Sequence, residues 1–209
     1  MVDKAQIETS CVEQGHQLSS QQYQLLADFV DLLDKWNQTY NLTAVRDKEH
    51  MVERHIVDSL SLLPYLSDGK LLDIGTGAGL PGIPLAIARP DIRTTLVDSN
   101  AKKTRFLQQV KAELALDNIN IIHGRIEKVL LTPYEMVTAR AFATVAEMIN
   151  MAGHHCIDGG QMLLMKGNYP ETELMALPAD FQQQIIQLNT PTDAARHLVI
   201  LQKMKTVKR

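Results

Sequence analysis

The strongest signal of fold in this chain is Leu71-Leu72-Asp73-Ile74-Gly75-Thr76-Gly77-Ala78-Gly79-Leu80-Pro81-Gly82. A short apolar run ends in an acid and gives way to a loop that holds four of the chain's eleven glycines. Glycine adopts backbone conformations that other residues avoid, and it lets a ligand approach the main chain closely. Pro81 and Gly82 suit the first turn of a helix. The stretch therefore predicts a β-strand, a ligand-binding loop and a helix in direct succession.

Two nucleotide cofactors fit this loop. Gly77-x-Gly79-x-x-Gly82 satisfies the dinucleotide fingerprint, and Asp98 follows at about the distance expected of a ribose-binding acid. Asp73, which precedes the first glycine, favours S-adenosylmethionine, because a carboxylate attracts its ammonium and sulfonium groups but repels a pyrophosphate. Asp73 also has a purely structural interpretation, in which its carboxylate accepts hydrogen bonds from loop amides.

Composition narrows the class of protein. With 209 residues, 45% of them hydrophobic, the chain can bury one large core. The formal net charge is -3, so any contact with nucleic acid must be a local patch. Cys11 and Cys156 have no partner motif, and no metal-binding pattern accompanies His154 and His155, so we expect neither disulfides nor a metal site. The sequence shows no signal peptide or membrane-spanning run, and we expect a cytoplasmic monomer.

Helical periodicity marks the first third of the chain. Apolar residues recur every three or four positions over residues 19–40, which predicts a long amphipathic helix with a capping box at Ser19 and Gln22. A second helix is predicted over residues 48–65. Because neither helix is followed by a strand, we expect residues 1–67 to form an N-terminal helical cap and residues 68–209 to form one compact core.

From residue 70 onward strands and helices alternate, which is typical of an α/β protein with a parallel sheet. Strands are expected at 71–74, 94–98, 119–123, 136–139 and 161–166, and helices at 82–89, 101–116 and 144–153. Two further strands, at 181–188 and 197–204, have no helix between them and predict an antiparallel pair at one edge. The expected architecture is a mostly parallel, Rossmann-like sheet of seven strands.

Ligands of such sheets bind beyond the carboxyl ends of the strands. The expected second strand ends in Asp98, whose carboxylate suits either the ribose hydroxyls of a cofactor or the start of the next helix. After the third strand, Ile126 suits either the face of an adenine ring or the protein core. The fourth strand ends in Arg140, and we expect this guanidinium to have a functional role near the shared pocket.

Further motifs share one resemblance with the glycine loop. They are Lys35-Trp36-Asn37, the run from Tyr40 to Asp47, Arg54-His55 with Asp58-Ser59, Thr138-Ala139-Arg140-Ala141 and Arg196-His197-Leu198-Val199. Together they resemble the bacterial small-subunit ribosomal RNA N7-guanine methyltransferases, a family formerly named glucose-inhibited division protein B. The similarity extends from about residue 20 to residue 199. Thr138 departs mildly from this pattern, because many relatives have serine there.

The resemblance implies a class I methyltransferase that uses S-adenosylmethionine. It implies that Gly75, Leu80, Ile126, Glu127 and Arg140 line the cofactor pocket, while Asp73 and Asp98 match the class as a whole. The residues expected at the cofactor are Asp73, Gly75, Gly77, Gly79, Leu80, Asp98, Ile126, Glu127 and Arg140. The implied acceptor is N7 of a specific guanine in the decoding-region loop of 16S ribosomal RNA, within the small ribosomal subunit or an assembly intermediate.

Candidates for RNA binding lie in the expected cap and at the end of the expected fifth strand. They are Asn41, Thr43, Arg46, Lys48, Arg54, His55 and Lys166. Ordinary solvated side chains are the alternative interpretation of the same residues.

Guanine N7 carries an in-plane lone pair and no proton, so its attack on a methyl sulfonium needs no general base. The rate then depends on holding donor and acceptor in line, which is worth roughly 7 to 11 kcal/mol in favourable systems. Arg140 is the one residue considered for a catalytic role. Two other functions fit parts of the pattern: an NAD-dependent oxidoreductase, and a ribosome-assembly factor that keeps the fold without catalysis.

Overall fold

The computed structural model describes residues 2–140, 143–174, 177–191 and 195–205. Its seven-stranded sheet has the order β3-β2-β1-β4-β5-β7-β6. The strands are β1 (Lys70–Ile74), β2 (Arg93–Asp98), β3 (Ile119–His123), β4 (Tyr134–Arg140), β5 (Cys156–Lys166), β6 (Phe181–Leu188) and β7 (Arg196–Lys203). Strands β1 to β5 pair in parallel, whereas β7 is antiparallel to both β5 and β6. The mostly parallel sheet with an antiparallel edge pair is therefore confirmed.

Helices surround the sheet. They are α1 (Lys4–Glu13), α2 (Ser20–Tyr40), α3 (Lys48–Met51), α4 (Asp58–Leu60), α5 (Gly82–Ala88), α6 (Ala101–Glu113), α7 (Val145–Ala152) and α8 (Glu171–Leu174). A π-helix occupies Val52–Val57, and short 3-10 helices occupy Leu63–Tyr65, Ile126–Lys128 and Gly153–His155. Across the described residues, no helix has both the length and the apolar character that a bilayer crossing requires.

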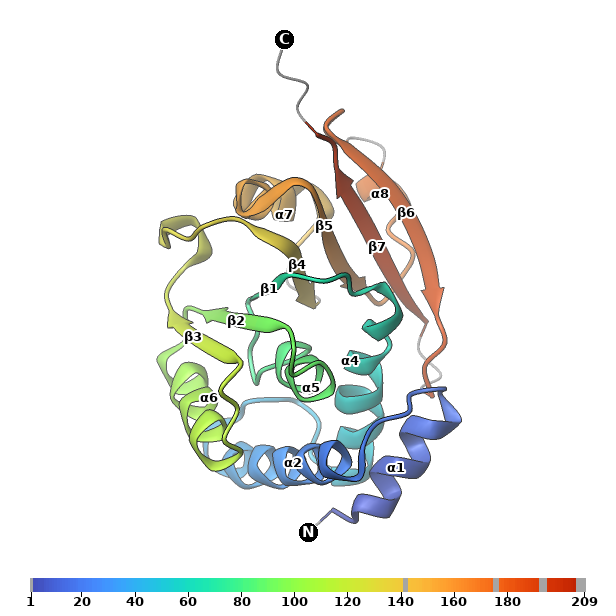
Figure 1. Ribbon diagram of the computed structural model, residues 1–209, viewed down its shortest axis with the longest axis vertical. Coiled ribbons are helices and arrows are strands. Elements are labelled where there is room, and N and C mark those ends of the chain that lie inside the picture. The colour runs from blue at the N-terminus through green and yellow to red at the C-terminus, as the bar shows by residue number, and fades with distance from the viewer. Residues whose placement is uncertain (1, 141–142, 175–176, 192–194, 206–209) are drawn as a thin grey trace.

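Both faces of the sheet are covered. The helices α2, α5 and α6 lie on one side and α7 lies on the other (Figure 1). Because successive side chains of a strand point to opposite faces, the neighbours Leu96 and Val97 of β2 enter different cores. Leu96 belongs to the core that contains Phe29 and Phe106, and Val97 to the core that contains Met148. The carboxyl ends of the parallel strands are left for the loops that follow them.

The N-terminal helices pack against the sheet's own helices. The capping box at the start of α2 is confirmed, since Ser19 and Gln22 exchange side-chain-to-amide hydrogen bonds of 2.8 and 3.3 Å. Helix α2 then contacts α5 and α6, and its Phe29 ring lies 6.3 Å from that of Phe106. Sequence reasoning missed α1, in which only Ile7 and Cys11 are buried, so its apolar pattern is weak.

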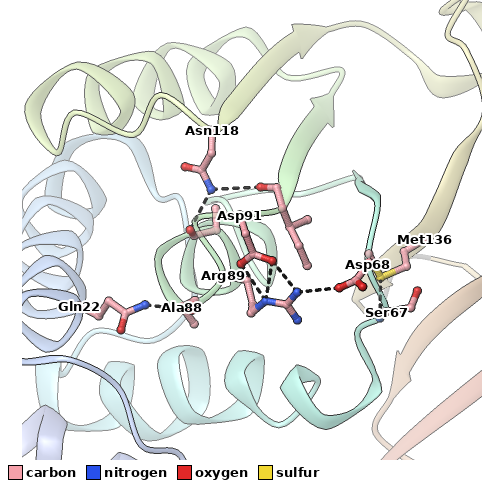
Figure 2. Close-up of polar contacts among 10 residues, drawn as sticks. Gln22, Ser67, Asp68, Ala88, Arg89, Asp91, Asn118 and Met136 are labelled. Atoms are coloured by element: carbon pink, nitrogen blue, oxygen red, sulfur yellow. Dashed lines mark hydrogen bonds and ion pairs between the residues drawn. The ribbon is translucent and has the colours of Figure 1, made fainter.

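Polar side chains hold the C-terminal end of α5, near the amino ends of the parallel strands (Figure 2). Gln22 donates to the carbonyls of residues 87 and 88, and Asn118 donates to those of residues 86 and 92. Arg89 pairs with Asp91 at 2.6 Å and with Asp68 at 3.4 Å. The last carbonyls of a helix lack intrahelical partners, and the Gln22 and Asn118 amides supply donors to those of residues 86 to 88.

The expected single helix over residues 48–65 is wrong in its middle and at its end. The path is helical from Lys48 to Leu60, but Val52–Val57 has π-helical hydrogen bonds and Leu63–Tyr65 is a 3-10 helix. The apolar spacing identified the helical path but contained no signal for the wider turn. Elsewhere, α6 ends at Glu113 because Ala115 has φ +51°, and β5 begins five residues earlier than expected, beside an irregular pairing of β4.

Candidate functional site

The glycine loop between β1 and α5 has the backbone that its sequence predicts. Gly75, Gly77 and Gly79 have φ values of +62°, +61° and +85°, in the region that favours glycine. At Gly79 an added Cβ would also overlap the side chains of Ile83 and Leu107. The glycines therefore provide the conformation of the loop and let it pack closely on α5 and α6.

Asp73 closes this loop from beneath. Its side chain is fully buried, and Oδ2 accepts hydrogen bonds from the Thr76 hydroxyl at 2.6 Å and from the Gly82 amide at 2.8 Å. Oδ1 has no partner among the described residues. Burial raises the pKa of Asp73 to about 7, although the two hydrogen bonds and the Arg140 guanidinium oppose that increase. These contacts match the structural interpretation of Asp73.

Asp98, at the end of β2, holds the loop from the side. Its Oδ2 accepts a hydrogen bond from the Gly77 amide, and its Oδ1 accepts one from the Asn100 amide, both at 2.8 Å. The Lys103 ammonium lies 4.0 Å from Oδ2. Asn100, not Asp98, caps α6, since its side chain accepts from the Lys102 amide. Asp98 therefore fixes the geometry between β1, β2 and the start of α6.

A cavity of about 440 Å³ opens beside this loop, at the carboxyl ends of β1, β2 and β3. We call it the β1–β3 cavity, and its lining includes Gly75, Asp98, Lys103, Ile126 and Glu127. Four of the nine residues expected at the cofactor thus line one cavity. Of the others, Asp73, Gly77 and Gly79 build the loop behind it, and Leu80 is buried in the core that contains α5 and α6.

A second cavity, of about 340 Å³, lies at the carboxyl ends of β4 and β5. We call it the arginine cavity, because its lining includes Arg54, Arg140 and Arg196 together with His55, Asp58 and Lys166. Arg140 was expected at the cofactor, but it lines this cavity and not the β1–β3 cavity. Its position still influences the glycine loop, since its positive charge lowers the pKa of Asp73. Ala141, which follows it, lies outside the described residues.

Asp58 binds two of these arginines. Its Oδ2 accepts from Arg140 Nη1 at 3.2 Å and its Oδ1 from Arg196 Nε at 2.9 Å. The carboxylate is 3% exposed, so it is removed from water almost completely. Asp58 and Arg196 were absent from the residues expected at the site. The signal that could have found them is their place in the Arg54-His55…Asp58-Ser59 and Arg196-His197 motifs.

The loop after α2 is held by side chains that were expected to touch RNA. Thr43 Oγ1 and His55 Nε2 are 2.8 Å apart, and the buried Asn37 bonds the Thr43 amide and the Val45 carbonyl. His55 is buried, and burial together with the Arg140 charge lowers its pKa to about 4. These contacts give Thr43 and His55 a structural role, and both also line the arginine cavity.

The remaining RNA candidates differ in whether their side chains already have a partner within the protein. Arg46 bonds Asn41 Oδ1 at 2.6 Å, and Lys48 pairs with Asp31 at 2.6 Å. Lys166 pairs with Glu173 at 2.9 Å and donates to the carbonyl of residue 143. Arg54 is exposed, and its side chain has no ion-pair partner among the described residues. Among all the residues that the structure describes, no cluster of three or more His, Cys, Asp or Glu side chains is placed to hold a metal ion.

Comparison with known proteins identifies a family. The family model GidB, described as rRNA small subunit methyltransferase G, matches residues 22–199. A protein named ribosomal RNA small subunit methyltransferase G from Neisseria meningitidis serogroup C (strain 053442) is 49% identical over 189 residues, which cover 89% of this chain and 91% of that protein. Another of the same name, from Marinobacter nauticus, is 50% identical over 185 residues, covering 87% and 86%.

Solved structures agree in fold. A predicted O-methyltransferase from Agrobacterium tumefaciens has a TM-score of 0.59 at 19% identity, covering 71% of this chain and 81% of that one. An rRNA methylase from Streptococcus thermophilus has a TM-score of 0.53 at 15% identity, covering 71% and 95%. The expected class I methyltransferase fold is confirmed. With the family model matching most of its length, the chain belongs to the GidB family, the rRNA small subunit methyltransferase G proteins.

Proposed function

We propose that this protein transfers a methyl group from S-adenosylmethionine to N7 of a guanine in 16S ribosomal RNA. The observation that carries the proposal is the family match over residues 22–199. The structure adds two cavities at the carboxyl ends of the parallel strands, where ligands of such sheets bind. One cavity has the residues expected for a nucleoside, and the other is rich in arginine.

The β1–β3 cavity fits the adenosine half of the cofactor. Each oxygen of Asp98 accepts one amide, which leaves lone pairs for two ribose hydroxyls. We assign Ile126, which lines this cavity, to the face of the adenine ring, and the positive-φ Gly75 lets the backbone approach the ligand. When bound, the cofactor supplies an electrophilic methyl group on a positively charged sulfur.

Asp73 acts on that charge through its electric field. The carboxylate is fully buried, and its Oδ1 has no partner among the described residues, so a nearby cation stabilises its ionised form. The Gly82 and Thr76 bonds fix the carboxylate directly under the loop. We therefore assign Asp73 both the structural role that its contacts show and an electrostatic role toward the methionine half of the cofactor.

The arginine cavity is the proposed place for the acceptor guanine. Among the described residues of its lining, the Asp58 carboxylate is buried between two guanidiniums and His55 Nε2 is paired with Thr43. His55 Nδ1 has no partner among the residues that the structure describes, but it is buried and so is not exposed to the cavity as a base. Such a lining suits an acceptor nitrogen that has no proton to lose. The residues of this cavity bind and orient the base, and in-line placement supplies most of the rate.

The division of the chain into a cap (1–67) and a core (68–209) is part of the proposal. The cap supplies Arg54 and Asp58 to the arginine cavity, and the core supplies Arg140 and Arg196. Arg54 is the best placed of the RNA candidates, because it is exposed and lacks an ion-pair partner among the described residues. We propose that a single copy of the chain acts in the cytoplasm on the small ribosomal subunit or on an assembly intermediate.

The test is a methyl-transfer assay with labelled S-adenosylmethionine. Small subunits and 16S transcripts that lack the modification are offered as acceptors, and N7-methylguanine is located by mass spectrometry. Calorimetry with S-adenosylmethionine and NAD tests the cofactor. Binding of NAD alone would reject the proposal in favour of an oxidoreductase. RNA binding that ignores both cofactors and transfers no label would favour an assembly factor.

A matched pair of variants locates the cofactor. Gly77→Asp puts a carboxylate beside Asp98 and the cavity, and we expect it to abolish binding of S-adenosylmethionine. Gly15→Asp makes the same change at a glycine that also has positive φ, where an added Cβ meets nothing within 4 Å. Equal loss of binding in both variants would contradict the assignment of the β1–β3 cavity.

A further inference from the structure

The arginine cavity contains one carboxylate that joins three elements. Asp58 begins α4, Arg140 ends β4 and Arg196 begins β7, and both guanidiniums meet the same buried carboxylate. The arginine side chains are 23% and 25% exposed, so each keeps one side toward solvent while Asp58 is covered. The mechanism proposed above lets this cavity bind the acceptor base, but it gives no role to the buried Asp58 carboxylate or to its two ion pairs. The geometry of these pairs therefore calls for a separate explanation.

The two guanidiniums keep donors that the protein does not use. Arg140 Nη1 donates to Asp58 and to the Arg54 carbonyl, at 3.2 Å each. Arg196 donates from Nε to Asp58 and from Nη1 to the carbonyl of Ala195. Within the described part of the chain, Nε and Nη2 of Arg140 and Nη2 of Arg196 have no partner. Because Arg140 and Arg196 both line the cavity, these donors can serve a ligand bound there.

The charge of the lining selects an anion. Three guanidiniums, from Arg54, Arg140 and Arg196, share the cavity with one carboxylate, while Lys166 is already paired with Glu173. A surplus of positive charge at a partly covered site favours a negatively charged group. Planar guanidiniums bind phosphate oxygens through parallel hydrogen bonds, which makes a phosphate the best match in shape as well as charge.

We infer that Asp58 is a positioning residue. It holds the guanidiniums of Arg140 and Arg196 in the orientation in which both donate hydrogen bonds to one backbone phosphate of the RNA substrate. This inference rests on the proposed function. An arginine side chain loses considerable rotamer freedom when it is fixed in one orientation. The Asp58 contacts impose that loss before the substrate arrives, so less of the binding free energy is spent on ordering.

Substitution of Asp58 by asparagine separates positioning from charge. Asp58→Asn removes one negative charge beside the proposed phosphate site, so a purely electrostatic role predicts tighter RNA binding. A positioning role predicts the reverse, because one guanidinium then faces an amide N–H2 group and loses its acceptor. The two explanations thus predict changes of opposite sign in the same measurement.

The measurement is binding of unmodified small ribosomal subunits as a function of salt, with KM and kcat for methyl transfer. We expect Asp58→Asn to raise the Kd and KM for RNA roughly tenfold, about one charge-assisted hydrogen bond. The slope of the logarithm of RNA affinity against the logarithm of salt concentration should fall in magnitude by about 0.7 for each phosphate contact that is lost. The Kd for S-adenosylmethionine should stay within about twofold. Unchanged or tighter RNA binding would overturn the inference.

Asp68→Asn is the matched control. Asp68 also pairs with an arginine, Arg89 (Figure 2), but it is fully exposed and is absent from the lining of both cavities. The control changes the net charge of the protein by the same amount as Asp58→Asn. Its RNA affinity should match that of the wild type. If Asp68→Asn weakens RNA binding as much as Asp58→Asn does, the effect belongs to overall charge and the inference fails.

A double-mutant cycle covers the case in which Asp58→Asn destabilises the fold. If Asp58 acts through Arg196, then Asp58→Asn should cost much less RNA affinity in an Arg196→Gln background than in the wild type. Thermal unfolding of all four proteins identifies any variant that is not folded at the assay temperature. Additive losses in folded proteins would reject the positioning role. Wild-type protein that neither binds RNA nor transfers methyl groups would instead reject the proposed function.

Discussion

The amide of Gly77 donates a 2.8 Å hydrogen bond to the carboxylate of Asp98, so the cavity's acid and the glycine loop form one rigid unit. Oδ1 of the same carboxylate holds the Asn100 amide at the start of α6. The residue that suits the ribose is therefore also the residue that shapes the loop. Substitutions at Asp98 should affect cofactor binding through both roles.

Asp98→Ala should weaken binding of S-adenosylmethionine by about 2 to 4 kcal/mol, because two backbone amides lose their acceptor along with the ribose. Isothermal titration calorimetry measures the change. Asp91→Ala is the control, since Asp91 is an exposed aspartate whose partner is Arg89. An affinity for the cofactor that is the same in Asp98→Ala as in the wild type would show that this carboxylate is not at the binding site.

Gly82→Ala should destabilise the folded protein by roughly 1 to 3 kcal/mol, because a side chain there has no room. Its Cβ would lie 2.6 Å from Asp73 Oδ2 and would overlap the side chain of Leu96. Urea unfolding measures the free energy. In the control Gly167→Ala, the new Cβ would meet only Arg196, at an ordinary 3.8 Å. Equal stability of the two variants would contradict the tight packing beneath the loop.

Asp73 should make stability depend on pH between about 4 and 7. Burial raises the pKa of Asp73 to about 7, so the folded protein holds a proton that the unfolded chain has released. Folding stability from this group is therefore greatest below pH 4 and falls as pH rises to 7, by up to roughly 4 kcal/mol. Unfolding of wild type and Asp73→Asn across this range measures the difference. A pH-independent difference would contradict a raised pKa.

The same titration predicts the pH dependence of cofactor binding. S-adenosylmethionine carries its positive charges in its methionine half, which we propose lies near Asp73. Only the ionised form of Asp73 attracts those charges. The affinity of the wild type should therefore rise as pH increases through about 7. Asp73→Asn should show a smaller rise, measured by calorimetry at matched ionic strength. An equal rise in both proteins would assign the effect to another group.

His55 should make the folded protein less stable as pH falls, which is opposite in sign to the effect of Asp73. Burial and the Arg140 charge lower its pKa to about 4, so the folded state favours the neutral ring. Its contribution is fully present above about pH 6.5 and is lost as pH falls toward 4, by up to roughly 3 kcal/mol. His55→Gln should lose less stability than the wild type over this interval. Parallel curves for the two proteins would show that His55 does not titrate in this way.

The glycine loop and the alternation of strands and helices in the core were predictable, because local chemistry determines them. Positive φ at Gly75, Gly77 and Gly79 follows from the residue type, and the alternation of strands and helices follows from periodicity. The resemblance supplied the function, which periodicity alone did not contain. Residues such as Asp98 could be placed because they end a strand at the edge where ligands bind.

The arginine cavity was predicted only in part. Arg140 was expected near the shared pocket because it ends β4, and the resemblance implied that it lines the cofactor pocket, which stays a prediction. Its ion pair with Asp58, 82 positions away, was not expected. Arg196 joins the same carboxylate from 138 positions away. Pairings across such separations are decided by packing of the whole chain. Sequence patterns within one element contain no record of them.

A change in the π-helix at Val52–Val57 can alter which cap residues line the arginine cavity, while the residues that the core supplies stay the same. A π-turn accommodates one more residue than the bonds of an α-helix would, so a single-residue deletion there can relax into a regular α-helix. Such a deletion would rotate the preceding helical turn by about 100° relative to α4. Arg54 would swing away while Asp58 stayed in place. Families that shorten this segment by one residue should therefore differ in the RNA they accept while keeping the same core.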